Sequence, residues 1–361
     1  MEYFVYITNE CNLNCKYCSV LLDYKTNNLP TSPSYSLWQL RDFISATQNK
    51  YDDKEAFIYF FGGEPTLDYD YIAEFMDFFG NCIGDVAVKY VLHTNGLLLQ
   101  KLPQRVAGSL SAIMHSINFE VIPRHHLQNS YFSKMIQAVH SLRRASRAIA
   151  IGRLTITENT SLYTGVMQLA HFYDLLYWQI INCDKFDDYK SFCRTYIYEV
   201  ELLFNYWLDY FKQGTFINLV PFVAIVKFML NHDRDDGKFS CGYGESMVYI
   251  QTDGSCYACS DSVASQIHCI GDIHRGVTLS QPSLFDLKCG NCGYRRLCMG
   301  RCGRMHKEYS SQHVSEYCAL NRYTFNLFLK AEPEIIKAYQ KYPPFQQYLN
   351  NPALNYTEYT P

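Results

Sequence analysis

The placement of cysteine constrains this chain more than any other feature of its 361 residues. Of its fifteen cysteines, three lie between residues 11 and 18 and nine lie between residues 241 and 318. Only Cys82, Cys183 and Cys193 are scattered, and these are expected to be ordinary buried small residues. No signal-peptide pattern opens the sequence, so we expect a reducing, cytoplasmic location where disulfides do not persist. Clustered thiols in such a protein indicate metal ligands or catalytic groups.

The amino-acid composition argues against some classes of binding partner. The formal net charge is only −3 and no block of like charge occurs, which argues against a nucleic-acid substrate and against electrostatic binding to a membrane. The most apolar stretch, residues 216–230, contains Pro221 and Lys227 and is too short to span a bilayer. The 31 Tyr and 23 Phe residues fit either a composition bias spread over core and surface or an aromatic cleft for an extended peptide.

Short β-branched or aromatic runs alternate with helical patterns through the first half of the chain. This alternation indicates βαβ units, a parallel sheet and an α/β fold, with the chemistry at the carboxyl ends of the strands. Six strands predict a curved sheet, either open or closing to a partial barrel. The predicted strands are 3–8, 56–61, 86–93, 112–116, 148–155 and 176–181. The predicted helices are 36–47, 69–80, 97–106, 131–145 and 161–172.

The second half predicts a different organisation. A long helix is expected over residues 189–212, followed by the apolar segment and then by the cysteine-rich region. A last helix over residues 322–341 is expected to end before Pro343 and Pro344. We therefore predict four parts. They are a catalytic domain at 1–188, a helical connector at 189–240, a cysteine-rich domain at 241–320 and a C-terminal helix with tail at 321–361.

The first cysteine cluster follows the first predicted strand directly. Cys11, Cys15 and Cys18 have the spacing CxxxCxxC. Three thiolates on one short loop can ligate three irons of a cubane cluster and leave the fourth iron open to a substrate, whereas electron-transfer clusters normally have four cysteines. The alternatives are a structural zinc or a cluster completed from elsewhere, although zinc sites favour paired C-x₂-C units and no second pair lies nearby.

At this point the sequence resembles the radical S-adenosylmethionine (radical SAM) superfamily, over most of its first 180 residues. The turn after the second strand reads Gly62-Gly63-Glu64-Pro65, and the third strand is followed by Thr94-Asn95-Gly96. In the family the GGEP turn contacts the methionyl amino group of S-adenosylmethionine, and the TNG segment lies beneath the ribose. Glycines allow close backbone approach, and carbonyl oxygens together with Glu64 could accept hydrogen bonds from an ammonium group.

The fourth strand departs from the family pattern. Related enzymes carry Ser-x-Asp-Gly there, whereas this chain has Ser116-Ile117-Asn118-Phe119, so the serine is kept and the aspartate and glycine are not. The resemblance gives Ser116 a role at the methionyl carboxylate or ribose. Arg153 in the fifth strand could pair with that carboxylate, since an interior arginine needs such a partner. For each of the two residues a structural role is an equal alternative.

The second cysteine region resembles the SPASM domain, with the pattern C…Gx₄C…Cx₂Cx₅Cx₃C…C. Asp253-Gly254 within it reads as a hairpin turn between two short strands. The resemblance implies two auxiliary [4Fe–4S] clusters in addition to the first. One would be held by Cys289, Cys292, Cys298 and Cys318, and the other by Cys241, Cys259 and Cys302. Sulfatase-maturating relatives have a further cysteine soon after the first, which is missing here. Cys256 or Cys269 could replace it, or one iron could stay open. A zinc ribbon is the alternative.

The resemblance implies an oxidoreductase with a partial (β/α)6 radical SAM barrel and a C-terminal SPASM domain. The reduced first cluster would cleave S-adenosylmethionine to methionine and a 5′-deoxyadenosyl radical, which would take a hydrogen atom from a peptide or protein substrate. A ribosomally made peptide, crosslinked through a thioether or carbon–carbon bond, is favoured over oxidation of a sulfatase Cys or Ser to formylglycine. A non-catalytic iron–sulfur electron carrier is the alternative of another class.

Two further expectations concern a base and the partners. Sulfatase maturases place an Asp directly after the Gx₄C cysteine, whereas Ser260 here precedes Asp261, which is either a base or an exposed structural residue. The expected partners are a low-potential electron donor such as flavodoxin or ferredoxin and, optionally, a separate leader-binding protein.

Overall fold

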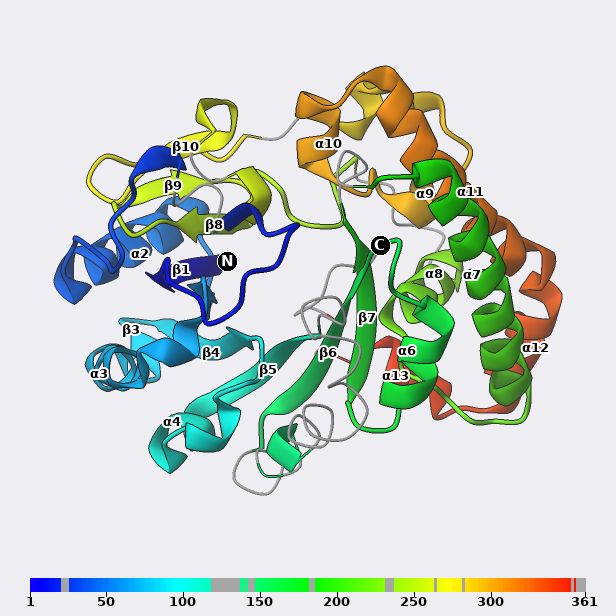
Figure 1. Ribbon diagram of the computed structural model, residues 1–361, viewed down its shortest axis with the longest axis horizontal. Coiled ribbons are helices and arrows are strands. Elements are labelled where there is room, and N and C mark those ends of the chain that lie inside the picture. Colours follow the sequence, from blue (N-terminus) through cyan, green and yellow to red (C-terminus); the bar gives the residue numbers. More distant parts are fainter. Residues whose placement is uncertain are drawn as a thin grey trace. The chain divides into compact units, whose positions relative to one another are not determined.

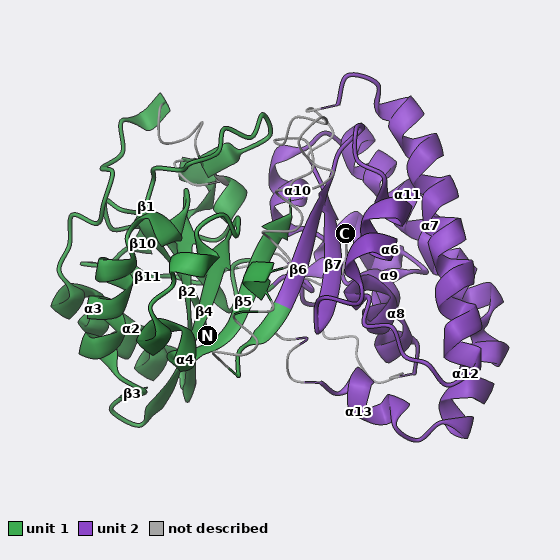
Figure 2. Ribbon diagram, turned by 60° about the horizontal axis from the view of Figure 1, so that its bottom comes forward, with its two compact units in different colours: residues 1–150, 242–281 green, residues 151–241, 282–361 purple. Residues whose placement is uncertain are grey.

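The chain forms two compact units in a computed structural model, and each is described by itself (Figure 2). The first unit comprises residues 1–150 and 242–281, and the second comprises residues 151–241 and 282–361. The structure describes residues 1–20, 26–117, 137–139, 141, 147–181, 186–230, 237–262, 265–280, 283–351 and 354. Cys183, Asn118, Phe119 and most of the helix predicted at 131–145 lie outside these residues.

Four parallel strands form the centre of the first unit, in the order β1, β2, β4, β5. Each agrees with its predicted strand to within two residues. Their β-branched and aromatic residues are largely buried, as is usual for parallel strands that are covered on both faces. The bounds are β1 Glu2–Thr8, β2 Glu55–Gly62, β4 Val86–Thr94 and β5 Leu110–Ile117.

Two of the three described helical predictions in this unit are confirmed. Helix α2 (Leu37–Tyr51) begins at a capping box formed by Ser36 and Gln39, and α3 (Tyr69–Phe79) begins at Asp68, whose side chain accepts from the backbone of Tyr71. The prediction of one helix at 97–106 is wrong. A 3₁₀ turn, Leu99–Lys101, is followed by the short helix α4 (Gln104–Ser109), because Pro103 between them cannot donate a backbone hydrogen bond.

The cysteine-rich region returns to this first sheet. Strand β8 pairs in parallel with β1, with Glu2 opposite Met247, and β9 and β10 continue the sheet in antiparallel fashion. The predicted Asp253-Gly254 turn joins β8 and β9, and Gly254 has a φ of +87°. The added strands are β8 Met247–Ile250, β9 Ser255–Tyr257, β10 Cys269–Asp272 and β11 Gly276–Val277, while β3 Cys82–Ile83 pairs with β4.

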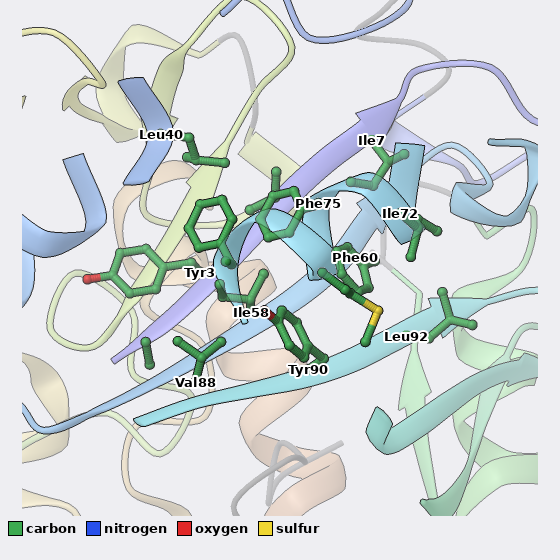
Figure 3. Packing of buried hydrophobic residues seen from close by; sticks show 14 of the residues in the cluster. Tyr3, Ile7, Leu40, Ile58, Phe60, Ile72, Phe75, Val88, Tyr90 and Leu92 are labelled. Carbon is green, nitrogen blue, oxygen red and sulfur yellow. The ribbon is translucent and has the colours of Figure 1, made fainter. Parts of the chain in front are cut away.

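The core of the first unit lies between this sheet and helices α2 and α3. Alternate residues of the strands, such as Tyr3, Phe60 and Tyr90, pack against Leu40 of α2 and Phe75 of α3 (Figure 3). The opposite face of the sheet carries an aromatic stack. Phe4 stacks on Tyr59 and on Tyr249, with ring centroids 4.1 and 4.3 Å apart. Both faces of the central strands are therefore filled, which fixes where their carboxyl ends lie.

The second unit contains two further parallel strands and most of the helices. Strands β6 (Ile149–Ile156) and β7 (Leu175–Ile180) confirm the last two strand predictions, and helix α6 (Leu162–Leu169) connects them. Helix α7 (Tyr189–Lys212) has the predicted bounds. Helix α8 (Val220–Leu230) takes up the apolar segment and is almost wholly buried. Among the described helices, none has both the length and the apolar character that crossing a bilayer requires.

Short helices surround the last cysteines, and the tail differs from its prediction. The expected single helix at 322–341 is two helices, because α11 ends at Lys330 and Pro333 lies in the first turn of α12, where its missing N–H is tolerated. In both views α7 and α11 lie side by side (Figures 1 and 2). The remaining helices are α9 Arg295–Cys298, α10 Gly303–Glu308, α11 Ser311–Lys330, α12 Glu332–Lys341 and α13 Phe345–Leu349.

Candidate functional site

The loop after β1 carries the first three cysteines, all of them half-buried. Its base is fixed by Asn9, a buried residue whose side-chain amide donates to Pro30 O at 2.8 Å and to Thr252 Oγ1 at 2.8 Å. Within the loop, the Cys18 N–H donates to Cys15 O, and the Leu13 N–H donates to Cys11 Sγ at 3.4 Å. Burial raises the pKa of the Cys11 thiol, and the nearby Cys18 raises it further. A cation bound beside the Cys11 thiol would instead lower its pKa.

The GGEP turn packs directly against the start of the cysteine loop. The Gly63 N–H donates to Thr8 O and the Glu64 N–H donates to Glu10 O, each at 2.8 Å. No side chain fits here, since a Cβ on Gly62 would lie 2.2 Å from Thr8 O and one on Gly63 would lie 2.1 Å from Glu10 O. Pro65 begins the 3₁₀ turn that follows. The two glycines thus hold the backbone immediately before Cys11.

The carboxylate of Glu64 joins this turn to the TNG segment. The side chain is 1% exposed, and Oε1 accepts from the Thr94 hydroxyl at 2.7 Å and from both the N–H and the hydroxyl of Thr66. Oε2 accepts from the Asn95 N–H at 2.7 Å. Burial raises the pKa of Glu64, whereas these four donors lower it. Four donors match the acceptor capacity of a carboxylate. Glu64 therefore ties the two turns together, and its contact with an ammonium group stays a prediction.

Asn95 links the TNG segment to the cysteine loop. Its side-chain amide donates to Asn12 Oδ1 at 2.7 Å and points to Cys11 Sγ at 3.9 Å. Behind it, His115 of β5 lies 3.2 Å from Asn95 O, and a Cβ on Gly96 would meet the His115 ring at 2.1 Å. Burial lowers the pKa of His115 to about 4, so the ring is neutral. Sequence reasoning missed His115, although a histidine within a buried strand is a usable signal.

Ser116 and Arg153 lie in different units. The Ser116 hydroxyl is 3.1 Å from His93 Nε2, which places both side chains at the carboxyl ends of β5 and β4. Arg153 of β6 belongs to the second unit, where its guanidinium donates to Gln179 of β7. Both residues thus have protein partners, and their roles at a cofactor stay predictions.

Asp261 lies beside the first cysteine loop. It is exposed, in a 3₁₀ turn at Ser260–Ser262, and its Oδ1 accepts from the Ser19 hydroxyl at 3.1 Å. The Tyr6 hydroxyl is 3.5 Å from Ser260 O, which connects the same turn to β1. Ser19 directly follows Cys18, so this contact brings the carboxylate to the loop across 242 positions of sequence. Sequence reasoning missed Ser19, since nothing in the chain order suggests it.

The remaining thiols of the first unit differ in burial. Cys256 is 0% exposed and lies in the hydrophobic core, and burial raises its pKa well above the ordinary value. Cys259 and Cys269 are half-buried, and the Cys269 thiol is 3.6 Å from Gly271 O. The two other predicted ligands of this set, Cys241 and Cys302, belong to the second unit. Of the two candidates for a fourth ligand, Cys269 is therefore the more accessible.

Four thiols of the second unit lie close together. Burial raises the pKa of Cys298 to about 12, with further increases from Cys318, Cys289 and Cys292. Burial likewise raises the pKa of Cys289 to about 11, again with Cys318 and Cys292 as neighbours. Thiols that raise one another's pKa in this way cannot all ionise unless a cation lies among them. The donor set therefore fits an iron–sulfur cluster.

Within the described ranges, no group of three or more His, Cys, Asp or Glu side chains is placed to hold a single metal ion. The thiols around a four-iron cube bind different irons, so they need not converge on one point.

No family model matches this sequence. Two curated relatives do. The chain is 24% identical over 332 residues to a cysteine-type anaerobic sulfatase-maturating enzyme of Clostridium novyi, covering 82% of this chain and 86% of that protein. It is 22% identical over 339 residues to the radical SAM cyclopropyl synthase TigE of Paramaledivibacter caminithermalis, covering 84% and 68%.

Solved structures show the same fold. The anSMEcpe structure with bound AdoMet matches with a TM-score of 0.70 and 18% identity, covering 99% of both chains. Streptococcus suis SuiB bound to S-adenosylmethionine matches with a TM-score of 0.54 and 14% identity, covering 86% of this chain and 74% of SuiB.

This chain is a radical SAM enzyme of the SPASM maturase group. The predicted α/β fold with a partial barrel and a C-terminal SPASM region is confirmed over the full length. S-adenosylmethionine and [4Fe–4S] clusters are the cofactors typical of this group. One anSMEcpe structure also contains a peptide, which is a fact about that protein. The electron-carrier alternative does not fit this membership.

Proposed function

We propose that this radical SAM enzyme binds S-adenosylmethionine at the Cys11–Cys18 loop and modifies a side chain of a ribosomally made peptide. One observation carries the proposal. The cysteine loop, the GGEP turn and the TNG segment, far apart in sequence, are tied together by the Glu64 carboxylate and the Asn95 amide. A simple electron carrier has no need for such an assembly.

The predicted site residues have different tasks. Cys11, Cys15 and Cys18 would hold three irons, and the cluster with bound S-adenosylmethionine supplies the 5′-deoxyadenosyl radical that takes a hydrogen atom from the substrate. Gly62 and Gly63 let the GGEP turn pack closely on the backbone before Cys11, and Glu64 holds that turn in place, where it would contact the methionyl group. Ser116 and Arg153 would bind the carboxylate or ribose.

Asp261 is our proposed proton acceptor. A side chain that loses a hydrogen atom and an electron also loses a proton, which needs an acceptor near the site. The carboxylate of Asp261 lies beside the cysteine loop and is oriented by the Ser19 hydroxyl. In sulfatase maturases the corresponding Asp lies one residue earlier, directly after the Gx₄C cysteine. Asp261 could still accept a proton from its own position.

Two auxiliary clusters would give a total of three. Cys289, Cys292, Cys298 and Cys318 would hold one, as their mutual proximity supports. Cys241, Cys259 and Cys302 would hold three corners of the other, with Cys269 rather than the core residue Cys256 as the candidate for the fourth. These clusters would accept the electron left by substrate oxidation.

Formylglycine formation on a sulfatase is the second candidate. The full-length likeness to anSMEcpe and the 24% identity to a sulfatase-maturating enzyme favour it, whereas the likeness to TigE favours peptide crosslinking. Mass spectrometry separates the two. Conversion of a cysteine thiol to an aldehyde in a sulfatase-derived peptide supports formylglycine formation, and loss of two hydrogens from a peptide encoded beside this gene supports crosslinking.

Deoxyadenosine formation tests the proposal. After anaerobic reconstitution with iron and sulfide, dithionite and S-adenosylmethionine are expected to yield 5′-deoxyadenosine. Cys15→Ala should abolish the product. Cys82→Ala is the matched control, because Cys82 lies outside every predicted cluster. The prediction that Cys82 is buried is wrong, since it is exposed on the short edge strand β3. Equal yields from both variants, or no product from the wild type, would contradict the proposal.

A further inference from the structure

The segment that carries the last cysteines is strongly basic. Between Lys288 and Arg322 the sequence has seven Lys or Arg residues and only two acidic residues, a formal charge of +5, whereas the whole chain carries −3. One of the acidic residues, Glu308, is paired with Arg304 at 2.6 Å. An isolated positive region on an otherwise acidic protein attracts acidic partners.

Part of this charge lies beside one of the four thiols. Arg322, one helical turn after Cys318 on α11, is exposed, and its Nη2 is 3.9 Å from Cys292 Sγ. The same guanidinium lies 5.9 Å from the Tyr294 ring centroid. Arg322 therefore connects solvent to a predicted cluster ligand through one side chain.

Apolar surface lies beside the charge. Phe285, in the 3₁₀ turn at Leu284–Asp286, is 51% exposed, and the Arg295 guanidinium lies 4.8 Å from its ring centroid. Lys288 and Arg296 are exposed and lie next to the cysteines in sequence, and Asp286 is the exposed acidic residue nearby. An exposed ring within a basic surround, above a redox centre, is typical of small, electrostatically steered electron-transfer interfaces.

We propose that this basic face, defined by Phe285, Lys288, Arg295, Arg296 and Arg322, is the docking surface for an acidic flavodoxin that exchanges single electrons with the four-cysteine cluster. A bound flavin presents an apolar ring edge, which the aromatic rings Phe285 and Tyr294 can contact, while acidic residues around it meet the guanidinium groups. In each encounter the cluster, having accepted the electron left by substrate oxidation, would lose that electron and the oxidised flavin would gain it. This inference rests on the proposed function, because it needs the cluster.

Charge reversal on this face tests the inference. Isothermal titration of the reconstituted holoenzyme with oxidised flavodoxin is expected to show binding that weakens as salt rises. The double variant Lys288→Glu/Arg296→Glu should weaken binding at low ionic strength by about tenfold or more and should flatten the salt dependence. Neither residue has been placed in the catalytic site, so dithionite-driven deoxyadenosine formation should stay unchanged. That second readout separates failure of docking from failure of the proposed function.

A matched double variant controls for net charge. Lys101→Glu/Lys330→Glu reverses two exposed charges outside the basic face and is expected to bind flavodoxin like the wild type. Equal weakening in both double variants would contradict the inference, as would unchanged binding in the first. If the holoenzyme bound a ferredoxin but not flavodoxin, the face would belong to another partner and the proposal would be overturned. The same would follow if the Lys288→Glu/Arg296→Glu variant lost binding to a polyglutamate peptide but still bound flavodoxin like the wild type.

Discussion

At the scale of single residues, Gly63 is the position where one added methyl group should do the most harm. Its Cβ would lie 2.1 Å from the carbonyl oxygen of Glu10, a backbone atom directly before Cys11. Gly63→Ala is therefore expected to lower the free energy of unfolding by about 2–3 kcal/mol. Urea unfolding of the holoprotein measures this loss, and the deoxyadenosine yield should fall with it.

Gly108→Ala is the control for that substitution. Gly108 lies in helix α4, and no atom is found within 4 Å of its Cβ position. Alanine there should raise the free energy of unfolding by about 0.5–1 kcal/mol through helix propensity. If Gly63→Ala were as stable and active as the wild type, the close packing of the GGEP turn on the cysteine loop would be wrong.

His115 should make stability depend on pH. Burial lowers its pKa from 6.5 to about 4 in the folded chain, so the unfolded chain binds more protons between these values. Its contribution is complete above pH 6.5 and is lost as the pH falls toward 4, by up to about 3 kcal/mol. His115→Gln is expected to remove this part of the pH dependence, as measured by urea unfolding across that range.

The exposed residue His274 supplies the comparison. His274→Gln should leave the pH dependence of unfolding as it is in the wild type. Should His115→Gln behave in the same way, the ring would not be held neutral by burial beneath the TNG segment.

At the scale of elements, the hairpin between β8 and β9 depends on one glycine. Gly254 has a φ of +87°, and an added Cβ would lie 3.0 Å from Cγ1 of Ile273. Gly254→Ala is expected to cost about 1–2 kcal/mol of stability, since residues with a side chain are strained in the left-handed region. Gly254→Asn should cost less, because asparagine tolerates that conformation. Thermal unfolding of the two variants tests the order, and equal costs would contradict it.

Elements with strong local signals could be predicted from the sequence. The parallel strands and helix α7 have continuous apolar or periodic patterns, and their bounds agree with the predictions. The failures have local chemical causes. Pro103 divides the expected helix at 97–106, and Pro333 begins a new helix where one continuous helix was expected. A helical periodicity that continues across a proline therefore does not predict one continuous helix.

At the scale of the whole molecule, the contacts that complete the site are non-local. The motifs before residue 100 follow from their spacing, but the pairing of β8 with β1 and the contact of Asp261 with Ser19 join residues more than 240 positions apart. The partners of Glu64 were also not predicted, because hydrogen bonds between turns leave no periodic pattern. Sequence thus predicts which residues carry the chemistry, whereas the structure is needed to see what holds them.

The four-cysteine set of the second unit gives a prediction about metal content. Cys298→Ala removes the thiol of the four-cysteine set whose pKa is raised most by burial. This substitution is expected to lower the iron content of the reconstituted protein by about four per chain. Cys193→Ala, which removes a half-buried thiol of α7, should leave it unchanged. Iron and sulfide analysis measures both, and equal iron in the two variants would exclude Cys298 as a ligand.

The central claim is that S-adenosylmethionine binds at the cluster held by Cys11, Cys15 and Cys18. Electron–nuclear double resonance of the reduced holoenzyme with S-adenosylmethionine labelled at its amino nitrogen and carboxyl carbon tests it most directly. We predict hyperfine coupling of both labels to a cluster, lost in Cys15→Ala and kept in Cys298→Ala. Absence of coupling in the wild type, or coupling that survives Cys15→Ala, would contradict the account.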